Sequence, residues 1–410
     1  MHHWKKLDPP DIKKRVFDAL EQNVDYASEE VLGVPASSLD SKVFYSNASF
    51  LQDAPFMSTL VHNPNHIGCH TLGESEPFFA GTQAIEREVI AICGADILNA
   101  PPGSIDGYVA AGGTEANIQA VWVYRNYFLR EHGARPEEIA ILCSADSHYS
   151  MDKAADVLMI DVLRVPVDAL SRTVQPDALE RTLTEARSGG KRFIVAVANM
   201  MTTMFGSVDD PDLYTEALQQ HGFAFKLHVD GAYGGFYFPF TGEQHRLDFR
   251  NPHVCSVTLD AHKMVQAPYG TGIFLVRKNH IRYANTRSAS YVAGEDFTLS
   301  GSRSGANAVA IWMILATYGP FGWREKIFIL QKRSDWFCER LKEMGIRHYR
   351  HPNANIITLD ARQVDPALAQ QFGLVPDNHH HPSWYKVVVM EHVIIEKLAH
   401  LASSLAAAAR

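Results

Sequence analysis

Three chemically suggestive groups of residues each follow a short apolar segment of this sequence. Lys263 comes just after VCSVTLD, Asp230 ends FKLHVD, and the turn AAGGTEAN (110–117) follows the segment that starts at Gly107. A charged lysine is costly to bury unless it has a role, whereas a neutral amine in that place can attack an aldehyde. A surface lysine at the end of a strand is the simpler explanation when Lys263 is considered alone.

The turn at 110–117 has the composition of an anion site. Gly112 and Gly113 let the backbone approach a ligand without a Cβ in the way, and Thr114 opens a helix. A helix N-terminus presents free N–H groups, so we expect Gly113 and Thr114 to bind a phosphate. A threonine cap without a ligand is the alternative. The turn is not GxGxxG, which argues against an NAD-dependent oxidoreductase.

The residues around Asp230 suggest an aromatic cofactor. A shielded carboxylate there would pair with a cation, such as the protonated pyridine nitrogen of pyridoxal 5′-phosphate (PLP), and Ala232 would pack on one face of the ring. His148, after IAILC, would stack on the other face, and Thr203, after FIVAVAN, would bond a ring substituent. Each has an ordinary structural alternative, namely a turn, a satisfied histidine or a cap. All fall at successive strand ends of one predicted sheet, so we predict a PLP site with Lys263 as the Schiff-base lysine.

A sheet must bring these residues together. Short apolar segments alternate with amphipathic stretches, which predicts an α/β fold with a mostly parallel sheet covered by helices on both faces. We divide the chain into an N-terminal helical arm (1–57), a large domain (58–285) and a small C-terminal α+β domain (286–410). The expected strands are 107–111, 139–143, 193–199, 225–230, 254–260 and 272–276, with helices over 12–24, 114–130, 306–317 and 321–345.

Composition limits the class of protein. The chain has 410 residues, 38 basic against 46 acidic, so its net charge of −8 gives no reason to expect nucleic acid or an anionic membrane as partner. No apolar run reaches the roughly 18 residues that span a bilayer, and the N-terminus lacks a secretory pattern. Five widely spaced cysteines predict reduced thiols rather than disulfides. We expect a soluble cytoplasmic enzyme.

From about residue 60 to 320 the chain resembles the group II PLP-dependent amino-acid decarboxylases of fold type I. The most specific similarities are the segments DGAYGG and the HK pair that contains Lys263. The resemblance implies the PLP roles given above and adds His262 as a phosphate neighbour. SGSRSG (300–305) resembles the segment whose serine reaches the phosphate of the neighbouring subunit, which implies a homodimer with Ser302 in a shared site. A plain polar turn before the following helix is the alternative.

Substrate residues are suggested by the resemblance of segment 62–79 to the stretch that lines the substrate side chain in glutamate decarboxylases. It places Cys69, His70 and Thr71 near the substrate and favours a polar or acidic side chain. The alternative is that the histidines of this segment are loop residues. We expect no metal, because no carboxylate or thiolate spacing supports one.

The chain departs from the family pattern in two places. Larger relatives have an arginine for the substrate α-carboxylate just after a strand like YKVVVM, where this chain has Glu391 and His392. Arg303 or His392 are the candidate replacements. The spacing from Lys263 to Ser302 leaves little room for a long catalytic loop, and Tyr291 is a weak candidate for its tyrosine.

These patterns predict PLP-dependent decarboxylation of an L-amino acid to its amine and CO2. The expected catalytic residues are Lys263, His148 and Asp230. A carbon–carbon lyase or aminotransferase of the same fold is the first alternative, because the same cofactor can break other bonds. A PLP-binding paralogue without activity is the second, and the missing arginine is its only support.

Overall fold

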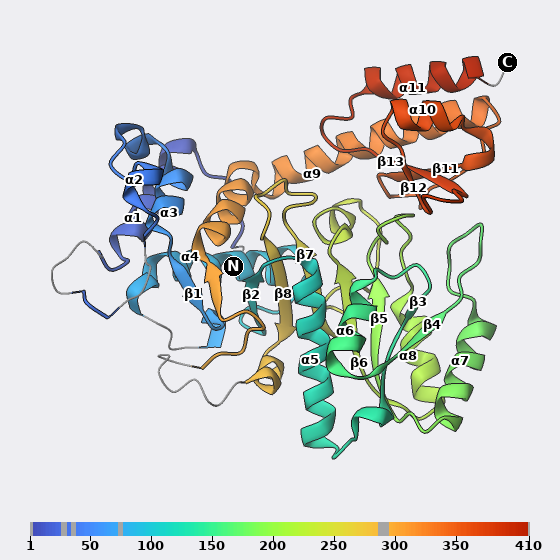
Figure 1. Ribbon diagram of the computed structural model, residues 1–410, viewed down its shortest axis with the longest axis horizontal. Helices are drawn as coiled ribbons and strands as arrows, with labels where there is room; N and C mark the ends of the chain where they lie inside the picture. The colour runs from blue at the N-terminus through green and yellow to red at the C-terminus, as the bar shows by residue number, and fades with distance from the viewer. Residues whose placement is uncertain (1–2, 26–30, 34–37, 73–76, 286–294, 409–410) are drawn as a thin grey trace.

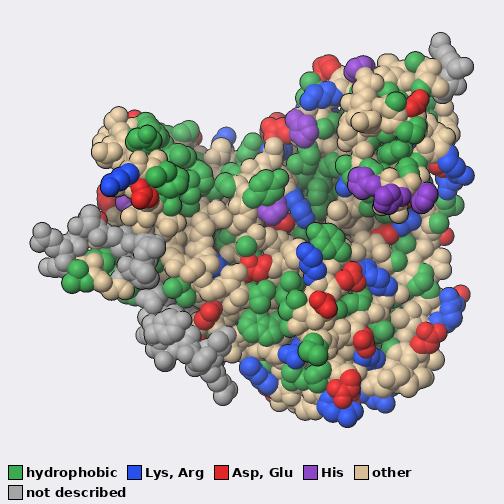
Figure 2. Space-filling view, viewed as in Figure 1, with side chains coloured by type: hydrophobic (Ala, Val, Ile, Leu, Met, Phe, Trp, Pro, Cys, Tyr) green, Lys and Arg blue, Asp and Glu red, His purple; other side chains and the backbone are tan. Residues whose placement is uncertain are grey.

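The computed structural model describes residues 3–25, 31–33, 38–72, 77–285 and 295–408. Tyr291 lies outside these ranges. Figure 1 shows a large body built around one twisted sheet, with the N-terminal helices at one end and a small C-terminal unit above the other. Helix α9, Gly305–Glu343, joins the large body to the C-terminal unit, which stands out from the body in the space-filling view (Figure 2). None of the described helices is long and apolar enough to cross a membrane.

The central sheet has seven strands in the order β2-β8-β7-β6-β5-β3-β4. Strands β3 to β7 run parallel, whereas β8 pairs antiparallel with both β2 and β7. The predicted mostly parallel sheet is therefore confirmed. The bounds are Ile105–Ala110 (β2), Ile139–Ser144 (β3), Asp161–Val165 (β4), Phe193–Asn199 (β5), Ala224–Gly231 (β6), Val254–Asp260 (β7) and Gly272–Arg277 (β8).

Strand β4 is the one strand of this sheet that the sequence did not predict. It lies at the edge, parallel to β3, and its first residue, Asp161, is exposed. Arg164, also in β4, bonds Asp152 instead of entering the core. An edge strand with two charged residues lacks the continuous apolar run that identified the others.

Both faces of the sheet are buried. Neighbouring residues of β3 belong to opposite cores, with Ala140 and Leu142 in one and Ile139, Ile141 and Cys143 in the other. This alternation is expected because successive strand side chains point to opposite faces. The helices that follow the strands are α5 (Gly113–Glu131), α6 (Ser150–Leu158), α7 (Pro176–Ser188) and α8 (Pro211–Gln220).

The N-terminal part packs on the start of α9. It contains α1 (Pro9–Glu21), α2 (Ser41–Phe44), α3 (Pro55–His62), α4 (Ala80–Ala91) and β1 (Asn65–Ile67). Strand β1 pairs antiparallel with β9, Ser302–Ser304, so the SGSRSG segment is partly a strand. Helix α9 breaks at Gly319, whose φ of 61° is left-handed, and Pro320 follows. The sequence predicted two helical stretches separated at this place.

The C-terminal unit has its own sheet and core. Its four strands have the antiparallel order β10-β11-β13-β12, with bounds His348–Tyr349, Ile356–Asp360, Trp384–Val388 and Val375–Pro376. Helices α10 (Pro366–Gln371) and α11 (Ile395–Ala408) complete it. Tyr385, Val387 and Val389 face the buried core of this unit. The opposite face of β13 lies toward the large body, as Trp384 packs edge-to-face on Phe205 with ring centroids 6.1 Å apart.

Candidate active site

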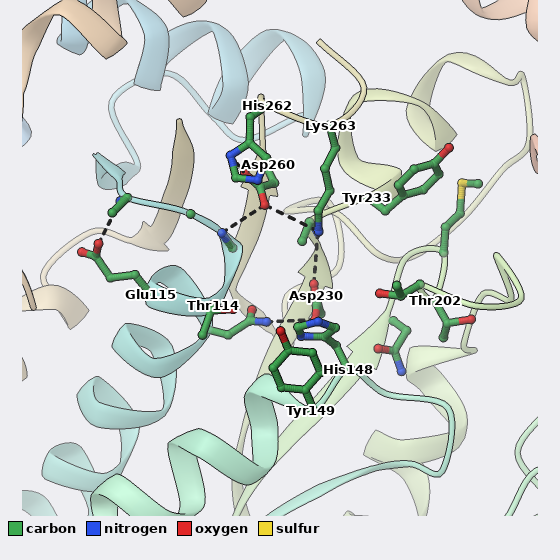
Figure 3. A pocket seen from close by; sticks show the side chains of 18 residues that line it. Thr114, Glu115, His148, Tyr149, Thr202, Asp230, Tyr233, Asp260, His262 and Lys263 are labelled. Carbon is green, nitrogen blue, oxygen red and sulfur yellow. Dashed lines mark hydrogen bonds and ion pairs between the residues drawn. The ribbon is translucent and has the colours of Figure 1, made fainter. Parts of the chain in front are cut away.

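A cavity of about 460 Å³ opens where β3, β5, β6 and β7 end. Parallel strands with helical crossovers place such crevices at the carboxyl ends of the strands. Figure 3 shows the side chains that converge on it. Every cofactor residue that the sequence predicted lines this cavity except Ser302, namely Gly113, Thr114, His148, Thr203, Asp230, Ala232, His262 and Lys263.

Lys263 lies in the turn after β7, beside an acidic partner. Its Nζ is 3.5 Å from Oδ2 of Asp260, and Oδ1 of Asp260 is 2.9 Å from Nδ1 of His262. Burial raises the pKa of the Asp260 carboxyl, although the charges of Lys263 and His262 act in the opposite direction. The lysine side chain keeps 31% of its surface exposed, so its amine is open to the cavity. Lys263 is therefore placed to react with an aldehyde there.

Asp230 is held by a chain of buried polar side chains. Asn117 Nδ2 donates to Asp230 Oδ2 at 2.9 Å, and Asn117 Oδ1 lies 3.0 Å from Nε2 of His228. His228 Nδ1 lies 2.7 Å from Ser256 Oγ. Burial lowers the pKa of His228 to about 4, so the ring is neutral at pH 7, and Nε2 can donate to Asn117. The carboxylate of Asp230 thus has a fixed orientation at the floor of the cavity.

The N-terminus of α5 has room for an anion. The N-cap residue, Gly112, has no side chain to cap this helix, and the first N–H groups of an α-helix have no intrahelical partner. The N–H of Gly113 donates to Asp260 Oδ2 at 3.1 Å. A Cβ on Gly113 would lie 2.9 Å from the Cβ of Ala232, so only glycine fits this close approach. An uncapped helix end that borders a cavity suits a phosphate group.

His148 and Tyr149 form one wall of the cavity. Their rings lie 4.0 Å apart between centroids, and Tyr149 remains exposed at the mouth. Burial lowers the pKa of His148, although the charge of Asp230 opposes this shift. On another side the exposed Thr203 lines the cavity, while its neighbour Thr202 is buried and bonds Ser207 at 2.7 Å between hydroxyl oxygens.

Four predicted substrate residues do not line this cavity in the single chain. His70 and Arg303 meet Glu86 in a buried cluster between α4, β1 and β9, where Arg303 forms a salt bridge with Glu86 and His70 Nε2 lies 3.2 Å from it. Cys69 Sγ donates to the carbonyl of Gly107 at 3.1 Å, and the Gly107 N–H donates to Thr71 Oγ1. These contacts engage Cys69 Sγ, Thr71 Oγ1 and His70 Nε2 within the chain, whereas His70 Nδ1 is buried without a hydrogen-bond partner among the described residues.

Among the described residues, His66, His70 and Glu86 are close enough together to hold a metal ion. The guanidinium of Arg303 already lies against the Glu86 carboxylate, and its Nη2 is 3.4 Å from His70 Nε2. Although burial alone would raise it, the pKa of Glu86 is held well below its usual range by Arg303, His70 and His66. A permanent cation therefore stands where a metal would have to bind.

Three other residues from the sequence analysis also lie apart from the cavity. Ser302 is exposed in β9, where its Oγ accepts a hydrogen bond from Asn65 at 3.1 Å. Glu391, at the position of the expected arginine, pairs with Lys326 at 2.8 Å. His392 is exposed and lines a different cavity in the C-terminal unit. Neither Arg303 nor His392 reaches the Lys263 cavity in this chain.

Sequence reasoning missed Asn117, His228 and Asp260. Two signals could have found the histidine and the asparagine. His228 lies two residues before Asp230 on one strand, so both side chains share a face. Asn117 lies one helical turn after Gly113 and shares its side of α5. Asp260 ends a buried strand next to the HK pair, and it lies at the carboxyl end of its strand as Asp230 does in β6.

Comparison with known proteins agrees with this geometry. The conserved domain of pyridoxal-dependent decarboxylases matches residues 67–348. Tryptophan decarboxylase from Clostridium sporogenes is 48% identical over 402 residues, which cover 98% of this chain and 96% of that protein. A probable L-tyrosine/L-aspartate decarboxylase from Methanocella arvoryzae is 32% identical over 359 residues, with coverage of 83% and 90%.

Solved structures share the fold. L-methionine decarboxylase from Streptomyces sp. 590 superposes with a TM-score of 0.71 at 20% identity and 99% coverage of both chains. Glutamate decarboxylase from Lactobacillus brevis gives a TM-score of 0.67 at 18% identity, with coverage of 98% and 92%. The family match, the relatives and the Lys263 cavity lead to one conclusion: the chain belongs to the pyridoxal-dependent decarboxylases and is a PLP-dependent carboxy-lyase.

Proposed function

We propose that this chain decarboxylates an L-amino acid with an aromatic side chain, with tryptophan as the first candidate, through PLP attached to Lys263. The observation that carries the proposal is the cavity in which Lys263, Asp230, His148 and the uncapped end of α5 meet. The 48% identity to a tryptophan decarboxylase supports the choice of side chain.

Each residue of the cavity then has a role toward the cofactor. Lys263 would hold the cofactor through its aldehyde, Asp230 would pair with its ring nitrogen, and the start of α5 with Thr114 and His262 would hold its phosphate. Ala232, His148 and Thr203 would contact its ring. When bound, PLP supplies a conjugated ring that accepts the electrons of the bond broken at the substrate Cα.

His148 is our candidate for the residue that protonates Cα after CO2 leaves. The backbone N–H of Ser150 donates to His148 Nδ1 at 3.2 Å, so the neutral ring carries its proton on Nε2. Because burial lowers the pKa of His148, its protonated form is a stronger proton donor than that of an exposed histidine. The negative charge of Asp230 acts in the opposite direction and favours the protonated form of His148.

An aromatic substrate replaces the polar or acidic one that the sequence suggested, and that earlier prediction stays unconfirmed. Its basis was Cys69, His70 and Thr71, which make polar contacts inside the chain. The walls of the cavity instead contain Tyr149 and Tyr233, which offer rings for a flat apolar side chain.

The test is a panel of L-amino acids incubated with the purified holoenzyme. Tryptophan, tyrosine, phenylalanine, methionine, glutamate and aspartate are compared by release of CO2 and formation of the matching amine. We expect the highest kcat/KM with an aromatic member. A higher value with glutamate or aspartate overturns the proposed side chain, and formation of an α-keto acid without CO2 overturns the proposed reaction.

We further propose that the working form is a homodimer in which Ser302 reaches the phosphate of the partner site. The exposed position of Ser302 in one chain is compatible with such a contact. We also propose a reducing, cytoplasmic location, which is supported by five buried cysteines that are all free thiols. Two measurements test the homodimer. Sedimentation gives the mass of the holoenzyme, and the Ser302→Ala variant should bind the cofactor less tightly.

A further inference from the structure

The Lys263 cavity is rich in acid and poor in cations. Three carboxylates line it, on Glu115, Asp230 and Asp260, whereas Lys263 is the only lysine or arginine among the described residues that do so. Its amine is consumed when it bonds to the cofactor, and burial lowers the pKa of both lining histidines, His148 and His262. An amino acid that enters this cavity brings a further carboxylate, which requires a cation from outside the lining.

The C-terminal sheet reaches the rim of the cavity at two places. Asn355 Oδ1 accepts a hydrogen bond from the hydroxyl of Tyr233 at 3.1 Å, and Tyr233 lines the cavity. Lys386 Nζ donates to the carbonyl of Thr203 at 3.0 Å, and Thr203 also lines it. Figure 1 shows β13, which carries Lys386, above the strand ends where these loops lie. Lys386, which also lines the cavity of the C-terminal unit, therefore lies directly beside a residue that lines the Lys263 cavity.

Among the described residues, no carboxylate forms a salt bridge with the ammonium group of Lys386. Burial first, and the charge of Lys263 second, lower the pKa of Lys386, and no acidic group of the described residues counters this shift. The two ammonium groups are thus close enough for the charge of Lys263 to disfavour that of Lys386. By contrast, the nearby Lys326 pairs with Glu391 at 2.8 Å. A half-buried cation left unpaired beside an acid-lined cavity is available for an incoming anion.

We propose that Lys386 binds the α-carboxylate of the substrate, in place of the arginine that this chain lacks. The strand orientation supports this role, since Lys386 and Trp384 share the face of β13 that lies on the Thr203–Phe205 segment. The proposal rests on the proposed function, because it needs an amino-acid substrate at Lys263. The competing role for Lys386 is purely structural: its hydrogen bond to Thr203 would only hold the C-terminal sheet against the large body.

The experiment separates these roles by comparing ligands that differ only at the carboxylate. The holoenzyme is mixed rapidly with L-tryptophan, L-tryptophan methyl ester and tryptamine, and dissociation constants come from the change in cofactor absorbance before turnover. Lys386→Gln should weaken tryptophan roughly tenfold or more and leave the ester and tryptamine within about threefold. Lys386→Arg should restore most of the affinity for tryptophan.

For each variant we compare the dissociation constant of the methyl ester with that of tryptophan. A loss of affinity that affects both ligands equally leaves this ratio unchanged. Lys397→Gln is the matched control, because it removes one exposed cation from the same unit and should leave the ratio unchanged. An unchanged ratio in Lys386→Gln, or equal weakening of all three ligands, overturns the proposal. If another amino acid binds best in the panel, its own acid, ester and amine are used. A failed aromatic preference is thereby distinguished from a failed role of Lys386.

Discussion

The Lys263 cavity and the cluster of α4, β1 and β9 both bring acidic, basic and histidine side chains together, but only in the cavity do these side chains face open space. In the cluster of His66, His70, Glu86 and Arg303, acid and base meet each other directly, and each residue is at most 8% exposed. In the Lys263 cavity, the Lys263 amine and one wall of histidine and tyrosine face open space. The comparison teaches that composition alone does not identify a reactive site. A polar side chain can bind a ligand only if it borders a cavity and is not already fully bonded to its neighbours.

Among the variants that keep Lys263, the largest expected effect on activity comes from Asp230→Asn. An amide cannot keep the ring nitrogen protonated, so kcat should fall roughly 10³-fold, while the fold survives because the asparagine is nearly isosteric. Steady-state kinetics, with thermal unfolding as the control for folding, measure this. Turnover near that of the parent protein would remove Asp230 from the ring-nitrogen role.

Glu86→Gln is the corresponding change in the closed cluster. It leaves the buried guanidinium of Arg303 without a charge partner, so the free energy of unfolding should fall by about 3–5 kcal/mol. The kcat of the folded fraction should stay within about threefold of the parent value. Denaturant unfolding and kinetics on the same preparation test this. A large loss of kcat with unchanged stability would mean that this cluster takes part in the reaction.

Acid should destabilise both regions through their buried histidines. Burial lowers the pKa of His66 and of His228 from 6.5 to about 4. In the unfolded chain both histidines take up a proton at higher pH than in the folded chain. The free energy of unfolding is therefore unaffected by them above about pH 6.5, and it decreases as the pH falls toward 4. The loss is on the order of 3 kcal/mol per histidine at most.

The matched variants for this pH dependence are His228→Gln and His379→Asn. Unfolding midpoints at pH 7.5 and 5.5 should lie closer together in His228→Gln than in the parent, because one buried titrating group is gone. His379 is exposed, so its replacement should leave the difference unchanged. Equal pH dependence in all three proteins would show that His228 is not held neutral by the fold.

Asn117→Ala should have the smallest effect. It removes the donor to Asp230 Oδ2 but leaves the carboxylate in place, so kcat should fall roughly tenfold with little change in KM. Kinetics at saturating substrate measure this, and the cofactor absorbance against pH reports whether the environment of the ring has changed. An unchanged kcat and an unchanged pH profile would make the contact purely structural.

The sequence predicted every strand of the central sheet except β4, their mostly parallel arrangement and the residues at the strand ends. It could do so because Asp230, His148 and Thr203 each follow an apolar segment, and parallel strands bring their carboxyl ends to one edge. It could not predict that His70 and Arg303 turn toward Glu86, because that cluster depends on how α4 packs on β1 and β9. Nor did the local pattern reveal Lys386, because its proposed role depends on its contact with Thr203, which lies 183 residues away in the chain.

The most direct test of the central claim is covalent trapping of the cofactor. The holoenzyme and its Lys263→Ala variant are treated with borohydride, digested, and mapped by mass spectrometry. We predict a single pyridoxyl-modified peptide containing Lys263 in the parent protein, and no site-specific modification in a folded Lys263→Ala variant that has lost turnover roughly 10³-fold or more. Modification of another lysine in the parent protein, or a single reducible adduct in the variant, would contradict the assignment of Lys263.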